Sequence, residues 1–170
     1  MTQNPHISEY HDSMVAFLEW IWGRDFMAPG GEGNVDKLVA GIELTGKRVL
    51  DIGCGIGGPA FVLARKYRAQ VTGIDLEPQL IERATRRAAE LGVSQQTEFR
   101  TVTLGPLDFP DKCFDVVIMS GALTQTEDKS GIVAECFRVL NPGGILTCYD
   151  WLKGAHSRTR WTCSKKTPRW

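Results

Sequence analysis

The chain has 170 residues, 42% of them hydrophobic, and its 20 basic and 20 acidic side chains cancel to a formal charge of zero. This length and composition predict one soluble globular domain with a substantial core, and the balanced charge gives no reason to expect nucleic acid or an anionic membrane as a partner. No signal peptide and no membrane-spanning stretch is expected. Five cysteines without regular spacing indicate neither a disulfide framework nor a metal site, and they favour a reducing, cytoplasmic location.

Residues 1–46 are expected to form a helical N-terminal lid. Apolar side chains at helical spacing predict an amphipathic helix over residues 8–22, closed by Gly23. Residues 25–33 are typical of a loop because they contain Pro29 and three glycines. A short helix over residues 35–40 should lead into the first strand.

Residues 47–152 show short apolar runs that alternate with helical periods, the pattern of a Rossmann-like, doubly wound, mostly parallel sheet. Helices are expected to begin at Pro59 and at Glu77-Pro78, and a third should cover roughly residues 132–140. The motif Asn141-Pro142-Gly143-Gly144 should end this third helix. The expected strands cover residues 48–52, 70–75, 97–102, 114–120 and 145–151.

A glycine-rich loop follows the first expected strand. Gly53, Gly55 and Gly57 lie there, and bare backbone can approach a ligand closely because glycine has no side chain. The spacing of Gly53, Gly55 and Gly58 also satisfies the dinucleotide fingerprint, so the glycines do not choose between S-adenosylmethionine and NAD. Cys54 is expected to be a small loop residue and not a nucleophile, since nothing nearby supplies a base.

Asp51 favours S-adenosylmethionine as the cofactor. A carboxylate two residues before the first glycine would repel the pyrophosphate of NAD, whereas it would attract an ammonium or a sulfonium group. Asp75 is placed to accept hydrogen bonds from both ribose hydroxyls, with Leu76 beside it to pack on the adenine. The alternative for Asp75 is a carboxylate that only caps the following helix. An NAD-dependent oxidoreductase remains a remote alternative for the whole chain.

Four sequence blocks resemble the successive motifs of class I S-adenosylmethionine-dependent methyltransferases: residues 49–58, Gly73-Ile74-Asp75, residues 109–115 and residues 138–144. The segment from Tyr10 to Gly31 further resembles the N-terminal lid of phosphoethanolamine N-methyltransferases and the related sarcosine and dimethylglycine enzymes. This resemblance implies a strand order of 3-2-1-4-5 with the final antiparallel strands missing. It also implies methyl transfer to a small-molecule acceptor, an amine in these enzymes.

The resemblance also assigns site residues. Tyr10 matches the lid tyrosine that lies against the transferring methyl group, which makes it the catalytic candidate. Thr103 stands before Leu104 where the family usually has an acidic residue that accepts from the adenine amino group, and a threonine oxygen can still accept. The predicted cofactor-binding residues are Met27, Asp51, Gly53, Cys54, Gly55, Gly57, Asp75, Leu76, Thr103, Leu104 and Ser120.

The chain departs from the family just after the fourth expected strand. The family has an Arg-Asp pair and a histidine there, whereas residues 120–126 read Ser-Gly-Ala-Leu-Thr-Gln-Thr. A catalytically inactive cofactor-binding or interaction module is therefore the alternative to an active enzyme.

Residues 153–170 form a basic tail without Asp or Glu. No Leu, Ile, Val, Met or Phe follows Leu152, so this tail is expected to be disordered and unable to supply the final strands of the family. A shifted reading frame in the coding DNA is our hypothesis for its origin. The fifth strand would then be an uncovered apolar edge, through which copies of the chain can associate.

Overall fold

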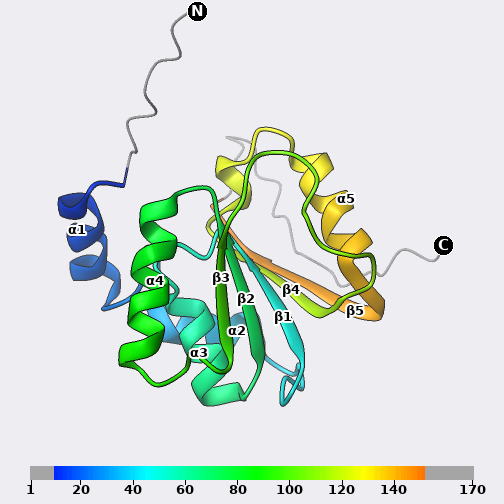
Figure 1. Cartoon of the computed structure of the whole chain (residues 1–170), viewed down its shortest axis with the longest axis horizontal. Helices are drawn as coiled ribbons and strands as arrows, with labels where there is room; N and C mark the ends of the chain where they lie inside the picture. Colours follow the sequence, from blue (N-terminus) through cyan, green and yellow to red (C-terminus); the bar gives the residue numbers. More distant parts are fainter. Residues whose placement is uncertain (1–9, 152–170) are drawn as a thin grey trace, which may run out of the picture.

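A computed structural model describes residues 10–151 of the chain (Figure 1). The tail 153–170 and the first residues of the helix expected over 8–22 lie outside this range. Five strands form one parallel sheet in the order β3-β2-β1-β4-β5, which confirms the predicted fold class. The strands are β1 (Arg48–Ile52), β2 (Gln70–Asp75), β3 (Thr97–Thr101), β4 (Phe114–Ser120) and β5 (Leu140–Tyr149).

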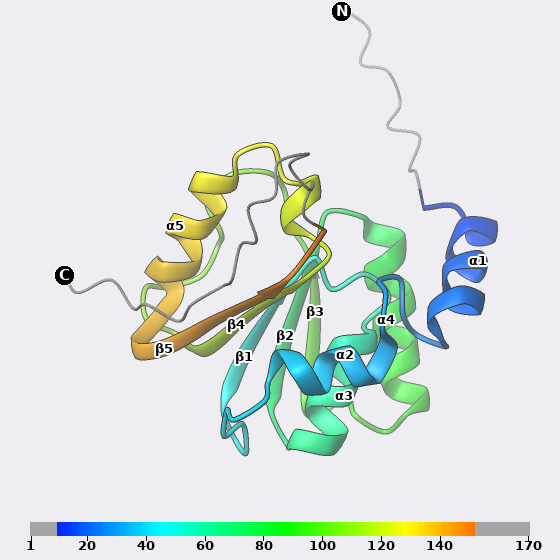
Figure 2. The same ribbon diagram turned by 180° about the vertical axis from the view of Figure 1, so that it is seen from behind.

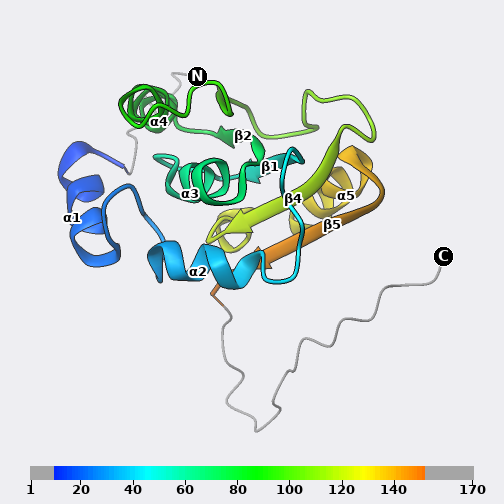
Figure 3. The same cartoon turned by 90° about the horizontal axis from the view of Figure 1, so that it is seen from below.

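Helices cover both faces of the sheet. One face carries α2 (Gly31–Leu38) and α3 (Gly58–Tyr67), with α4 (Pro78–Glu90) beside α3, as the view from behind shows (Figure 2). The other face carries α5 (Lys129–Val139), which lies across the strands from α2 in Figure 3. This arrangement follows from right-handed crossovers between parallel strands.

Neighbouring residues of the central strands point into different halves of the core. Val49 packs toward α2 and α3, whereas Leu50 packs toward α5. In β4, Ile118 and Val117 divide in the same way, and neither is exposed at all. The alternation is the strand period of two, and burial on both faces explains why these strands read as continuous apolar runs.

Helix α1 (Asp12–Trp22) lies outside the sheet layers, next to α4. His11 precedes it as N-cap, and the His11 ring accepts a hydrogen bond from the Met14 backbone at 3.2 Å. Val15 is the buried residue of α1, and Arg83 of α4 forms an ion pair with Asp12 at 2.9 Å. No helix among residues 10–151 is both long enough and apolar enough to cross a membrane.

The predicted bounds of several elements were wrong. Helix α1 was expected from residue 8, but Tyr10 and His11 are not helical and the helix begins at Asp12. Helix α2 begins at Gly31 and ends at Leu38, four residues earlier at its start than expected, because the packing of Val35 in the core outweighs the poor helix propensity of its glycines. Helix α5 begins at Lys129, where Asp128 caps it by accepting from the Gly131 backbone at 2.8 Å.

Strand β5 was expected over residues 145–151, but it covers Leu140–Tyr149. Leu140 pairs with Phe114 and Ile145 with Val116, so residues 141–144 bulge out of the ladder instead of forming a turn before it. Within the described part of the chain β5 pairs with β4 and forms one edge of the sheet.

Candidate functional site

The candidate site lies at the carboxyl ends of β1, β2 and β4. The chain runs from β1 outward to β3 and then returns to β4 on the other side of β1, so the strand order reverses between β1 and β4. Ligands of doubly wound sheets bind in the crevice at such a point.

The glycine loop is held in a fixed shape by hydrogen bonds to neighbouring backbone. The amides of Gly53 and Cys54 both donate to the Ile74 carbonyl, at 2.9 and 3.0 Å, and the Gly57 amide donates to the Cys54 carbonyl at 2.9 Å. Gly53 and Gly55 have φ values of +71° and +54°, which glycine adopts without strain. A side chain at Gly53 would also overlap Ala122, so both the turn and the close approach require glycine there.

Asp75 connects the glycine loop to the end of β2. Its carboxylate accepts one hydrogen bond from the Gly55 amide at 2.9 Å and another from the Glu77 amide at 3.1 Å, just before α4. The contact with Glu77 agrees with the alternative that Asp75 stabilises the helix start. A carboxylate has about four acceptor positions, so these two bonds leave capacity for ribose hydroxyls. Burial raises the pKa of Asp75, and the backbone hydrogen bonds oppose this rise.

Asp51 is a buried carboxyl group without a partner. Its side chain is fully buried, and neither carboxylate oxygen has a hydrogen-bond partner among residues 10–151. Burial, and then the nearby charge of Asp75, raise the pKa of Asp51 to about 7. An unpaired buried carboxylate is costly, so a cationic group that enters beside it would supply the missing interaction. The residues present therefore fit a cofactor that carries an ammonium group.

Cys54 is buried beneath the loop and is not an activated nucleophile. Burial raises the pKa of its thiol well above the usual range, and the charges of Asp51 and Asp75 raise it further. The thiolate is the reactive form of cysteine, so this environment keeps Cys54 inert.

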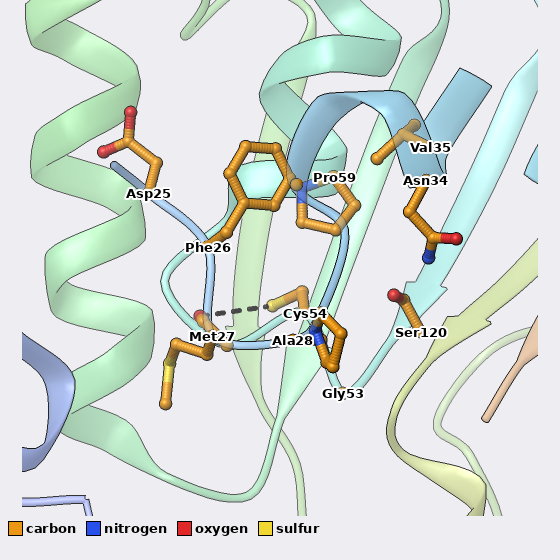
Figure 4. A pocket seen from close by; sticks show the side chains of 13 residues that line it. Asp25, Phe26, Met27, Ala28, Asn34, Val35, Gly53, Cys54, Pro59 and Ser120 are labelled. Atoms are coloured by element: carbon orange, nitrogen blue, oxygen red, sulfur yellow. Dashed lines mark hydrogen bonds between the residues drawn. The ribbon is translucent and has the colours of Figure 1, made fainter. Parts of the chain in front are cut away.

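A small cavity of about 40 Å³ lies between the glycine loop and the segment that precedes α2 (Figure 4). The lid segment, residues 25–29, forms one wall, and Ser120 at the end of β4 forms part of the opposite wall. The lining residues are Asp25, Phe26, Met27, Ala28, Pro29, Gly31, Asn34, Val35, Gly53, Cys54, Gly55, Pro59 and Ser120.

The cavity unites five of the predicted site residues, namely Met27, Gly53, Cys54, Gly55 and Ser120. The remaining predicted cofactor residues do not line it. Asp51, Gly57 and Asp75 lie at or below the glycine loop, whereas Leu76, Thr103 and Leu104 follow β2 and β3 and are exposed to differing degrees, Leu104 by 77%.

Sequence reasoning missed Asn34 and Phe26, which both line the cavity. Asn34 is 7% exposed, and its side chain lies across from that of Ser120 (Figure 4). An asparagine inside a short helix is a weak signal, because asparagine is common in loops and the helix start was placed too late. Phe26 carried no signal beyond its apolar character.

Tyr10, the catalytic candidate, connects the lid to the loop after β4. Its hydroxyl donates a hydrogen bond to the Gln125 side-chain oxygen at 3.2 Å, and the side-chain amide of Gln79 donates to the Tyr10 backbone carbonyl at 3.3 Å. The ring also packs on a buried cluster that contains Ile56 of the glycine loop and Leu80 of α4. Gln125 was not predicted, because nothing in the sequence places it next to a residue 115 positions earlier.

Among residues 10–151 no group of three or more His, Cys, Asp or Glu side chains could hold a metal ion. The polar groups that are present are a glycine loop, an unpaired buried carboxyl and a second carboxylate at the end of β2. Together with the sheet order, they define a class of Rossmann-like proteins that bind a nucleoside cofactor with a cationic group.

The comparison with known families agrees with this class. A family model described as a methyltransferase domain matches residues 50–148, which is more than half of the chain. The chain belongs to this methyltransferase domain family, as its motifs predicted.

Individual relatives add detail. The chain is 43% identical over 107 residues to a sterol 24-C-methyltransferase of Gibberella zeae, and 33% identical over 146 residues to phosphoethanolamine N-methyltransferase 1 of Arabidopsis thaliana. These matches cover 63% and 85% of this chain but 28% and 29% of the relatives, so the chain spans less than a third of their length.

A solved structure of phosphoethanolamine N-methyltransferase 2 from Haemonchus contortus, in complex with S-adenosyl-L-methionine, has the same fold. Its TM-score is 0.79 at 29% sequence identity, and the match covers 89% of this chain and 36% of that one.

Proposed function

We propose that this methyltransferase transfers a methyl group from S-adenosylmethionine to the nitrogen of a small-molecule amine. S-adenosylmethionine is the cofactor of the site: the matching solved structure contains it, and the chain carries its glycine loop and acidic residues. The unpaired buried carboxyl of Asp51, which a cationic ammonium group would satisfy, supports the cofactor part of the proposal. The amine acceptor is supported by the 33% identity to the phosphoethanolamine N-methyltransferase over 85% of this chain.

The described residues can hold the cofactor in three ways. Asp51 would attract its ammonium group, Asp75 would accept from its ribose hydroxyls, and the backbone at Gly53 and Gly55 would allow close approach. Leu76, Thr103 and Leu104 would surround the adenine, and Met27, Cys54, Gly57 and Ser120 would shape the rest of the site.

When bound, S-adenosylmethionine supplies an electrophilic methyl group. The work left to the protein is to place the acceptor nitrogen in line with that methyl group and to exclude water. An amine that binds neutral would form the new bond to the methyl carbon with its own lone pair, S-adenosylhomocysteine would leave as the bond to sulfur breaks, and the product would lose its proton to water. No side chain would then have to act as a base. The hydrogen-bonded pair of Tyr10 and Gln125 would position the acceptor.

We also propose that residues 1–46 act as a lid over residues 47–152. A hydrophobic cluster supports this role of the N-terminal residues, because it joins them to the glycine loop and to α4. It contains Val15, Ile56 and Leu80, with Tyr10 and Met27 packed against it.

Methylation of a sterol carbon is a second candidate, favoured by the 43% identity to the sterol enzyme. Radiolabelled S-adenosylmethionine should be incubated with the full chain and with phosphoethanolamine, sarcosine, dimethylglycine or an unsaturated sterol. Transfer to an amine is expected. Label found in the sterol instead would replace the amine proposal with the second candidate. No transfer to any acceptor, despite binding of S-adenosylhomocysteine, would favour a cofactor-binding module without catalysis.

We further propose that copies of this chain associate through β5. Support comes from its position at the sheet edge among the described residues, from the absence of charged residues in Leu140–Tyr149, and from the 41% exposure of both Ile145 and Tyr149. Light scattering across a concentration series should show a mass that rises above 18.9 kDa, and a constant monomer mass would contradict the proposal.

A further inference from the structure

The lid segment, residues 25–29, lies directly on the glycine loop. A side chain on Gly58 would overlap the Asp25 carbonyl, and one on Gly55 would come within 3.1 Å of the Met27 sulfur. Ala28 approaches the loop after β4 in the same way, at 3.4 Å from where a side chain on Gly121 would begin. The lid segment therefore contacts the glycine loop directly, through the Asp25 carbonyl and the Met27 side chain.

The segment needs a device to hold it there, because its first residue has an unfavourable backbone conformation. Asp25 has a φ value of +71°, in the left-handed region that side chains other than glycine rarely adopt. Aspartate is one of the few residue types that tolerate this region, at some cost in free energy. Such a conformation persists when surrounding contacts enforce it.

Two helices supply those contacts. From α4, the Arg87 Nε donates to the Asp25 carboxylate at 2.8 Å, and the two side chains are only 19% and 17% exposed. From α1, the Glu19 carboxylate accepts from the Asp25 amide at 2.9 Å. Glu90 bonds a second nitrogen of Arg87 at 2.8 Å and so orients the guanidinium. In Figure 4 the Asp25 carboxylate is turned toward α4 and away from Asn34 and Ser120.

The lid segment also forms one wall of the cavity beside the glycine loop, which has a volume of about 40 Å³. A cofactor that lies against the glycine loop would be covered on this side for as long as residues 25–29 stay in place.

We propose that the ion pair between Arg87 and Asp25 is a latch that holds the lid segment closed over the cofactor site. Arg87 is then a positioning residue, since it acts on the cofactor through the lid. Breaking the pair lowers the population of the closed lid, and apparent affinity falls in proportion to that population. The inference rests on the proposed cofactor role of the site and not on the identity of the acceptor.

The test compares two single substitutions on α4. Arg87→Met removes the latch, whereas Arg86→Met removes the same charge from the next position, where the side chain is exposed. Calorimetry with S-adenosylhomocysteine should show a dissociation constant about tenfold higher for Arg87→Met, and a value within twofold of the unsubstituted chain for Arg86→Met. Arg87→Lys should recover part of the affinity, because it keeps the charge without the planar donors of arginine.

Limited proteolysis gives a second readout that does not depend on methyl transfer. Arg24 is exposed and directly precedes Asp25, so trypsin should cut there faster in Arg87→Met, and S-adenosylhomocysteine should slow this cleavage. If Arg87→Met does not fold, Asp25→Asn removes the charge while keeping a residue that tolerates positive φ.

Equal dissociation constants and equal cleavage rates for Arg87→Met and Arg86→Met would overturn the latch, even if both variants are less stable. An unsubstituted chain that does not bind S-adenosylhomocysteine would instead overturn the cofactor role together with the latch.

Discussion

Asp51→Asn removes an ionisable group from the fully buried end of β1. The carboxyl ionises near 3.8 in the unfolded chain, whereas its pKa is about 7 in the folded protein. Between these values the folded protein keeps a proton that the unfolded chain has lost. The contribution of Asp51 to stability therefore falls as the pH rises from about 4 to 7, and it stays at its lowest above pH 7.

The difference between 3.8 and about 7 corresponds to about 4 kcal/mol of destabilisation above pH 7, at roughly 1.36 kcal/mol per pH unit. Asparagine does not ionise but still buries a polar amide. We therefore expect Asp51→Asn to raise the free energy of unfolding at pH 8 by ~2 kcal/mol, about half of that destabilisation. That gain should raise the melting temperature by about 4–8 °C for a chain of this size. Near pH 4 the gain should vanish.

Thermal unfolding followed by circular dichroism at pH 4, 6 and 8 measures this dependence. Asp108→Asn is the control, since it removes an exposed carboxyl and should leave the melting temperature nearly unchanged. The same Asp51→Asn protein should bind S-adenosylhomocysteine at least tenfold more weakly, about 1.4 kcal/mol, because the ammonium group loses its carboxylate. A variant that is less stable than the unsubstituted chain at pH 8, or that binds equally well, would refute the reasoning.

Three further predictions concern other parts of the molecule. Gly53→Ala and Gly92→Ala each place an alanine at nearly the same positive φ, +71° and +70°, but only Gly53 lacks space for a side chain. Denaturant unfolding should show that Gly92→Ala lowers the free energy of unfolding by about 1–2 kcal/mol, and that Gly53→Ala lowers it by about 1–3 kcal/mol more. Tyr10→Phe removes the hydroxyl bonded to Gln125, so kcat should fall about tenfold while calorimetric affinity for S-adenosylhomocysteine stays within twofold; an unchanged kcat would remove Tyr10 from the acceptor site. Met119→Ala should destabilise the protein by about 2–5 kcal/mol in urea, because the side chain is 1% exposed in the core, and a loss below 1 kcal/mol would contradict this packing.

The fold was predictable because its signals are local. β1, β2 and β4 each appear as a short apolar run bounded by glycine or charged residues, and their predicted bounds match the structure. Errors fell where local signals conflict with long-range pairing. Residues 141–144 are typical of a turn, yet pairing of Leu140 with Phe114 draws them into β5 as a bulge.

The site was only partly predictable. The glycines and Asp75 stand in a recognisable spacing, and the structure joins them through the bond from the Gly55 amide to Asp75. Asn34 and Gln125 carried no usable signal, because each enters the site through the docking of a separate element.

The sequence by itself determined which segments form strands and which form helices, where the cofactor loop lies, and the family, because periodicity and turn chemistry act over a few residues. Only the tertiary structure decided that Asp51 has no hydrogen-bond partner within residues 10–151, that Arg87 meets Asp25, and that Tyr10 meets Gln125. These properties depend on contacts between residues far apart in the chain and on exclusion of water, and neither is encoded in the spacing of neighbouring residues.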